Sequence, residues 1–203
     1  MSAGDETRAP AYRRSAGSER GEARRRDLLT RVTDDLAAHG LVDFSLRRAA
    51  KAAGTTHKVL LYYFDGPDDL LAQAMSELRR RRVDEGASAA GRQDSLADRV
   101  RALWPVLTSG HAWVHDQGMG LMLYDPGRYL ELGRSSSEQY LPALVALCPE
   151  HWTRRRKTEV SEMIMAALRG FVIDRLASGE DSGVDAGFEA LARALDREEA
   201  SPG

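Results

Sequence analysis

The segment from Ser45 to Phe64, SLRRAAKAAGTTHKVLLYYF, constrains the fold of this chain more than any other. Apolar and small residues recur in it at spacings of three and four, which places them on one face of a helix. Gly54 interrupts this pattern, and glycine readily adopts the left-handed backbone conformation that ends a helix and turns the chain. We therefore expect two short helices joined at Gly54, with basic and hydrogen-bonding side chains left on the outside.

The residues that flank these helices predict a helix-turn-helix. Ser45 precedes the first helix and Thr55 or Thr56 precedes the second, so their hydroxyls can cap the first amides of each helix. In a helix-turn-helix the second helix enters the major groove, where Arg and Lys suit guanine and His or Thr can donate or accept. Tyr62 and Tyr63 carry hydroxyls for phosphates, although one of them can instead belong to the core. The predicted DNA-binding residues are Ser45, Arg47, Thr55, Thr56, His57, Lys58, Tyr62 and Tyr63.

The order of residues around this motif resembles the N-terminal domain of the TetR family of transcriptional repressors. The resemblance covers roughly residues 24 to 75 and rests on Phe44-Ser45-Leu46-Arg47, Ala53-Gly54, Leu60-Leu61-Tyr62-Tyr63-Phe64 and Asp68-Asp69-Leu70-Leu71. It implies an all-α fold and a ligand-responsive repressor, which binds a palindromic DNA operator as a homodimer and is released by a small-molecule effector. Leu61 and Pro67 depart from the family pattern, in which a Tyr and a Lys at these places often touch DNA phosphates.

The resemblance and the composition together divide the chain into three regions. Residues 1–21 are rich in Gly, Ser, Ala and Arg without an apolar period, which predicts a disordered basic arm that either reaches DNA or stays a solvated tail. Residues 22–66 form the predicted three-helix DNA-binding domain, whose first helix we expect from about Glu22 to His39. Residues 67–203 form the predicted helical effector-binding and dimerisation domain.

Sequence signals that begin and end helices continue through the third region. Pro67 is expected to begin a helix that extends to about Val83, and the run Arg79 to Arg82 covers all sides of one turn, so most of it should be solvated. Pro105 lies within a later apolar stripe and should kink or break that helix. Apolar residues then repeat at three and four from Val160 to Leu176, and a final short helix should begin near Asp185.

Aromatic and methionine residues gather between Trp104 and Tyr140, where they form either an effector site or ordinary core. His111 and His115 share one helix face, but Ala112 stands where the HExxH motif of zinc hydrolases has its general base. Without a nucleophile elbow, a phosphate loop or a CxxC pair, we expect no metal, no cofactor and no catalysis. The predicted effector-binding residues are Trp104, His111, Trp113, His115, Gln117, Met119, Met122, Tyr124 and Tyr129.

By the resemblance, the last two long helices pair with their copies across a two-fold axis and form a four-helix dimer interface. The predicted interface residues are Met163, Ile164, Ala167, Leu168, Phe171, Arg175, Phe188, Leu191 and Leu195.

Composition adds limits of its own. No apolar run approaches the about 20 residues that cross a bilayer, and the N-terminus is too polar for a signal peptide, so we expect a cytoplasmic protein without membrane contact. Residues 1–66 carry 12 Lys or Arg against 9 Asp or Glu, a net charge of +3, which leaves −5 on the remainder. The positive charge of residues 1–66 favours DNA binding by this region. Cys148 is the single cysteine, and we expect it to be a passive, partly buried thiol.

Two other classes of function stay open. A helical homodimeric adaptor that binds proteins and has lost DNA binding would account for Leu61 and Pro67. A helical enzyme would need convergent ionisable groups, and the chain carries none of the motifs named above.

Overall fold

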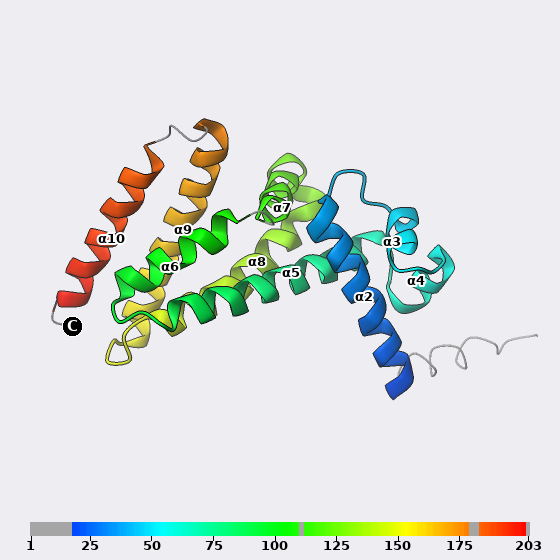
Figure 1. The fold of residues 1–203 in the computed structure, drawn as a ribbon, viewed down its shortest axis with the longest axis horizontal. Helices are drawn as coiled ribbons and strands as arrows, with labels where there is room; N and C mark the ends of the chain where they lie inside the picture. The colour runs from blue at the N-terminus through cyan, green and yellow to red at the C-terminus, as the bar shows by residue number, and fades with distance from the viewer. Residues whose placement is uncertain (1–17, 110–111, 179–182, 202–203) are drawn as a thin grey trace, which may run out of the picture. The chain divides into compact units, whose positions relative to one another are not determined.

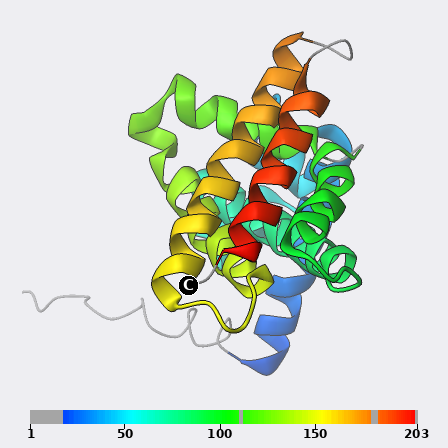
Figure 2. The same cartoon turned by 90° about the vertical axis from the view of Figure 1, so that its left-hand side faces the viewer.

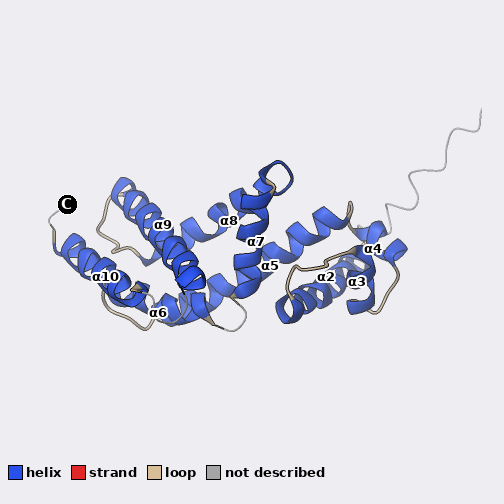
Figure 3. Ribbon diagram, turned by 90° about the horizontal axis from the view of Figure 1, so that it is seen from above, coloured by secondary structure: helices blue, strands red, loops and turns tan. Residues whose placement is uncertain are grey.

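A computed structural model describes residues 18–109, 112–178 and 183–201, and all regular structure within these ranges is α-helical (Figures 1 and 3). The predicted all-α fold class is confirmed. The chain divides between Met75 and Ser76 into two compact units, nine residues later than the predicted boundary after Gly66. In chain order the helices are α2 (Glu19–His39), α3 (Leu46–Ala52), α4 (His57–Tyr63), α5 (Pro67–Ala90), α6 (Leu96–Thr108), α7 (Trp113–Tyr124), α8 (Pro126–Leu147), α9 (Arg154–Ser178) and α10 (Val184–Ala200).

The first unit contains α2, α3, α4 and the first turns of α5. The helix α3 packs against both α2 and α4, and α2 buries Leu28, Val32 and Leu36 completely. The residues follow the three-and-four spacing of an amphipathic helix, which is why α2 can support the motif from behind.

The helix α2 begins at Glu19, three residues before the expected start at Glu22. Ser18 caps it, because its Oγ accepts a hydrogen bond from the Gly21 amide at 3.1 Å. Residues 19–21, which were assigned to a disordered arm, are therefore helical. The rest of the predicted arm, residues 1–17, lies outside the described residues.

The second unit contains the rest of α5 and the helices α6 to α10. The helix α10 packs against α6 and α9, α8 packs against α9, and α7 packs against α8. Figure 2 shows α9 and α10 side by side along much of their length. The core that these helices share includes Leu96, Val100, Leu144, Trp152, Ile164, Leu168, Phe188 and Leu195.

The expected break at Pro105 does not occur, since α6 continues through it to Thr108. Pro105 lacks the amide hydrogen that would reach the Arg101 carbonyl, so α6 gives up one hydrogen bond there and still continues for three more residues. The Thr108 hydroxyl donates to the Trp104 carbonyl at 2.9 Å and the Ser109 hydroxyl donates to the Val106 carbonyl at 3.2 Å, so side chains satisfy carbonyls near the helix end.

Cys148 ends α8 and is buried in the core of the second unit, as expected for a passive thiol. Its Sγ lies 3.5 Å from the Ser161 Oγ and 3.6 Å from the Leu144 carbonyl oxygen. Burial raises the pKa of this thiol, which keeps it protonated and unreactive. None of the helices within the described ranges is long and apolar enough to cross a membrane.

Candidate nucleic-acid interface and effector site

The two helices of the motif each begin with a side-chain cap. The Ser45 Oγ accepts a hydrogen bond from the Arg48 amide at 3.3 Å, and the Thr56 Oγ accepts one from the Val59 amide at 3.4 Å. Thr56, and not Thr55, is therefore the cap of α4. Such caps fix where each helix starts and so fix which residues face outward.

The turn between α3 and α4 depends on Gly54, whose φ of +62° lies in the left-handed region. The Thr55 amide reaches back to the Ala50 carbonyl at 2.9 Å and the Gly54 amide to the Lys51 carbonyl at 3.2 Å. These bonds close the end of α3 and turn the chain directly into α4, as the sequence predicted.

The outer side of the motif carries the predicted base-reading side chains. Thr56, His57 and Lys58 are exposed at the start of α4, whereas Leu60 is completely buried. Lys58 lies about 200° around the helix from Leu60, which places these two side chains on opposite faces. Arg47 is exposed on α3.

The two tyrosines of α4 are both half-buried. Their rings meet edge to face with centroids 4.8 Å apart, which holds each ring in place against the other. The Tyr63 carbonyl also accepts a hydrogen bond from the Arg25 Nε at 3.4 Å. Both tyrosines therefore have a packing role beside the predicted phosphate contact. Thr55 is half-buried as well, and Ser45 is exposed.

Two arginines that the sequence did not single out as structural hold this motif together. The Arg48 Nε pairs with Asp35 of α2 at 2.8 Å, and its Nη1 donates to the Val42 carbonyl at 2.8 Å. The Arg25 guanidinium lies 5.2 Å from the centre of the Phe64 ring and also binds Gln73. Their partners are 6 to 48 residues away in the chain, so no local sequence signal identifies these roles.

Leu61 and Pro67, which stand where the family often has residues that touch DNA phosphates, are both exposed. Leu61 presents 48% of its surface on the same short helix as Lys58. Pro67 is the first residue of α5, where its missing amide hydrogen costs nothing. Neither side chain can donate a hydrogen bond to a phosphate.

The predicted effector-binding residues differ in their surroundings: some pack with the core and others are exposed. Trp104 stacks on Phe188 of α10 with ring centroids 4.9 Å apart and belongs with the core. Tyr124 is 88% exposed in the last turn of α7, so neighbouring residues do not enclose its ring and its place in an effector site stays a prediction. Trp113 is also exposed, and His111 lies outside the described residues.

The remaining predicted effector residues are half-buried. Met122 packs so closely on α8 that a Cβ at Gly133 would overlap its sulfur, and Arg128 lies 5.0 Å from the centre of the Tyr129 ring. Burial lowers the pKa of His115 to about 3, with Arg82 and Arg79 adding to the effect through their positive charges. The residues of this group are His115, Gln117, Met119, Met122 and Tyr129.

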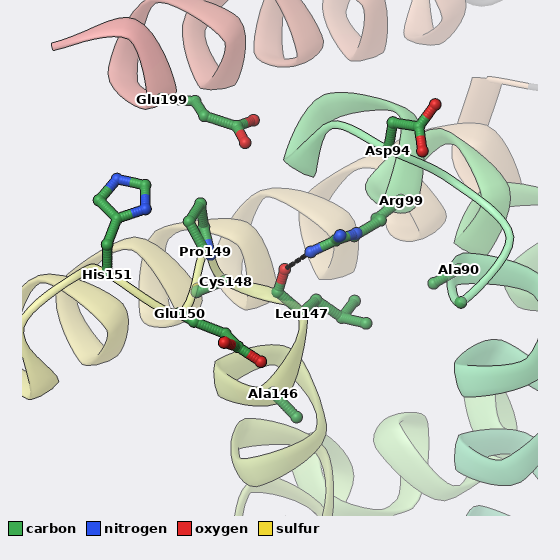
Figure 4. A pocket seen from close by; sticks show the side chains of 11 residues that line it. Ala90, Asp94, Arg99, Ala146, Leu147, Cys148, Pro149, Glu150, His151 and Glu199 are labelled. Atoms are coloured by element: carbon green, nitrogen blue, oxygen red, sulfur yellow. Dashed lines mark hydrogen bonds between the residues drawn. The ribbon is translucent and has the colours of Figure 1, made fainter.

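A surface hollow of about 510 Å³ opens in the second unit (Figure 4). The Arg99 guanidinium crosses one side of it to donate to the Leu147 carbonyl at 2.7 Å. The lining of the hollow includes none of the eight predicted effector-binding residues that the structure describes. Its lining consists of Ala90, Gly91, Asp94, Arg99, Ala146, Leu147, Cys148, Pro149, Glu150, His151 and Glu199.

The predicted dimer interface is also divided. Four of its residues are buried in the core of one chain and expose little surface to a second copy: Ile164, Leu168, Phe188 and Leu195. Phe171 and Leu191 pack against that core, and Ala167 is half-buried. Met163 and Arg175 are exposed. The apolar residues on the outer side of α9 instead include Ile173 and Leu176, with 46% and 62% of their surface exposed.

No known family model matches the sequence, and no curated protein matches it. Solved structures match the fold. A TetR-family transcriptional regulator from Cytophaga hutchinsonii has a TM-score of 0.67 at 12% identity, over 89% of this chain and 96% of that one. A TetR transcription regulator from Haloarcula marismortui has a TM-score of 0.61 at 16% identity, over 87% and 98%. The multidrug binding protein EbrR in complex with proflavin has a TM-score of 0.62 at 19% identity, over 84% and 98%. The chain has the fold of TetR-type transcriptional regulators.

Proposed function

We propose that this chain, which has the fold of TetR-type regulators, is a ligand-responsive transcriptional repressor of that family. It binds a palindromic DNA operator as a homodimer and is released by a small-molecule effector. The observation that carries the proposal is the exposure of Arg47, His57 and Lys58 on a capped helix-turn-helix that also buries Ala49, Ala50 and Leu60.

The chemistry of these exposed side chains fits the major groove of DNA. Arg47 and Lys58 donate to guanine acceptors, and His57 donates or accepts according to its tautomer. The Thr56 Oγ accepts the capping hydrogen bond of α4, so we expect Thr56 to support DNA binding by fixing where this helix begins. The binding of these cations to a phosphate-rich duplex makes operator affinity fall as salt rises.

The proposed dimer forms through the outer side of α9. Met163, Ala166, Gly170, Ile173 and Ala177 recur at spacings of three and four and are all exposed. Small residues among them allow two helices to approach closely. Two copies then present recognition helices to half-sites about 34–36 Å apart, which is why we expect an approximate palindrome.

The effector acts on the second unit in this proposal. The solved complex of EbrR with proflavin supports a small-molecule site in a chain of this fold. An effector that binds better to a conformation with low DNA affinity shifts the population toward it, and couplings of about 1–3 kcal/mol are typical of such systems.

Selection of bound sequences from random double-stranded DNA tests the proposal. We expect enrichment of one palindromic sequence. With that DNA, Lys58→Ala should lose about 1–3 kcal/mol of binding free energy and reduce the salt slope by about 1 in fluorescence anisotropy. Lys157→Ala is the matched control, since Lys157 lies on α9 in the second unit and its loss should leave both quantities unchanged.

The proposal fails if no sequence is enriched and binding to random DNA is no stronger than that of the Lys58→Ala variant. A helical adaptor protein would then be the better reading of the exposed Leu61 and Pro67.

A further inference from the structure

Two arginines of α5, the buried Arg79 and the half-buried Arg82, have no carboxylate partner among the described residues. Arg79 is only 3% exposed, and its guanidinium binds neutral groups: the Gln139 Oε1 at 2.5 Å and the Ser135 Oγ at 2.8 Å. The Arg82 Nη2 donates to the Leu107 carbonyl at 2.7 Å, while its Nε is buried without a hydrogen-bond partner. Across the described ranges, neither arginine forms an ion pair.

A buried hydroxyl and a third cation lie beside them. The Tyr140 hydroxyl is buried next to Arg82 and makes no hydrogen bond of good geometry. Burial raises the pKa of Tyr140, and the positive charges of Arg82, Arg79 and Arg169 oppose this increase. The Arg169 Nη2 also donates to a neutral group, the Ser137 Oγ, at 3.2 Å.

The groups of α7 that face this cluster do not balance its charge. His115 is neutral near pH 7, because its pKa lies at about 3. The positive charge of Arg82 lowers the pKa of the Asp116 carboxyl, but burial has the larger effect and raises this pKa, which disfavours the charged form. The cluster therefore holds more positive than negative charge.

This arrangement is unfavourable without a ligand and favourable with one of the right charge. A buried cation whose partners are neutral does not recover the hydration that it lost. The guanidinium fork matches the paired oxygens of a carboxylate or phosphate, and a tyrosine hydroxyl can donate to the same anion. The unused donors of Arg82 and Tyr140 are of the type that such an oxyanion requires.

We propose that Arg79, Arg82 and Tyr140, the anion centre, bind the oxyanion head of a small organic effector, a carboxylate or a phosphate. This inference rests on the proposed function, in which the second unit receives an effector. It adds that the effector is negatively charged and that α5, α7, α8 and α9 meet at its head group.

Thermal unfolding of the full chain at constant ionic strength tests the anion centre. The probes are two matched pairs, octanoate with octanamide and phenyl phosphate with phenol. We expect at least one anion to raise Tm by several degrees while its neutral partner does not, because ligands that bind only the folded state stabilise it. The pair that responds identifies the head group as carboxylate or phosphate. Equal effects of anion and neutral partner in both pairs would overturn the inference.

Variants separate an anion site from a structural cluster. Arg82→Met should abolish the anion-induced shift and leave the Tm of the free protein unchanged or higher, because it removes an unbalanced buried charge. Arg80→Met is the matched control on the same helix, since Arg80 is exposed and pairs with Glu77 and Asp84, and it should keep the shift. An unchanged shift in Arg82→Met contradicts the anion centre.

Tyr140→Phe keeps the test decisive if Arg82→Met does not fold. It removes one donor and little volume, so we expect a several-fold increase in the Kd of the responding probe; an unchanged Kd in this variant counts against the centre. Because these measurements contain no DNA, they fail separately from the proposed function. If the chain selects a palindrome but neither anion raises its Tm, the proposed function stands and the anion centre is contradicted. If an anion raises Tm but no palindrome is selected, the anion centre stands and the proposed regulator is contradicted.

Discussion

At the level of single residues, the neighbouring arginines of α3 have different tasks. Arg47 is exposed, whereas Arg48 binds Asp35 and the Val42 carbonyl. We predict that Arg48→Ala lowers the free energy of unfolding by about 1–3 kcal/mol, because Asp35 then loses its charged partner. Arg47→Ala should leave stability within about 0.5 kcal/mol and weaken operator binding.

Thermal unfolding and fluorescence anisotropy, measured on both variants, check this division of tasks. Each variant is the control for the other, since both remove one arginine from one short helix. Equal losses of stability in the two variants would show that the assignment is wrong.

The neutral state of His115 predicts a pH dependence of stability. Its pKa is about 3 in the folded chain against 6.5 as its ordinary value. Between these values the unfolded chain binds a proton that the folded chain does not, so stability rises with pH and is lost as pH falls below 6.5. The slope from this residue is at most about 1.4 kcal/mol per pH unit. Asp116 acts in the opposite sense as pH rises above 3.8, its ordinary pKa, because burial raises the pKa of its carboxyl.

Urea unfolding from pH 7 to pH 5 measures this slope. His115→Gln should flatten it, while His151→Gln should not, because His151 is exposed. The same slope in His115→Gln and in the unaltered chain would contradict the assignment of a buried, neutral imidazole.

At the level of secondary-structure elements, the turn at Gly54 is the strictest requirement of the motif. A side chain at φ +62° is strained even though the nearest atom to a Cβ there, the Arg31 Nη1, is 3.9 Å away. We predict that Gly54→Ala costs about 1–2 kcal/mol of stability through backbone strain alone.

Gly120→Ala is the matched control for the turn. Gly120 lies within α7 in open space, so alanine there should raise stability by up to about 1 kcal/mol through helix propensity. Circular dichroism melts of the two variants should therefore shift in opposite directions. A loss at Gly120 as large as at Gly54 would mean that backbone strain is not the cause.

How far the sequence predicts an element depends on whether its signals are local. Capping hydroxyls, a turn glycine and a three-and-four spacing are local, and they predicted α3, α4 and the turn between them. The same spacing could not show which apolar residues of α9 face the core and which face outward, because apolar residues occupy more than one side of this helix. Ile164 and Leu168 enter the core of the chain while Met163 and Ile173 face outward.

The run Arg79 to Arg82 shows the same limit at the effector site. Charge alone predicted a mostly solvated turn, and this prediction is wrong: Arg80 is exposed, whereas Arg81 and Arg82 are half-buried and Arg79 is buried. Arg79 is buried because Gln139 and Ser135, 60 and 56 residues further along the chain, supply its hydrogen bonds. Only the packing of α8 against its neighbours reveals which arginine enters the interior.

At the level of the whole molecule, the proposed homodimer predicts linked losses. Ile173→Arg places a charge in the proposed interface on the outer side of α9, so we expect a monomer and at least tenfold weaker operator binding. Light scattering with size-exclusion chromatography gives the mass, and anisotropy gives the affinity.

Leu123→Arg provides the control for this effect. Leu123 is apolar and 68% exposed, but it lies on α7. That variant should remain a dimer with unchanged affinity. A monomeric unaltered chain at micromolar concentration would remove the basis for the palindrome.

The rate at which Cys148 reacts with a thiol reagent can report the opening of the second unit. Cys148 is the single thiol of the chain, and the core covers it. A maleimide reagent can therefore label the native protein only when that part of the structure opens, and the labelling rate reports the free energy of this opening. The first unit contributes no background to the signal. An oxyanion that binds the second unit should slow the labelling, while an operator duplex that binds the first unit gives an independent comparison.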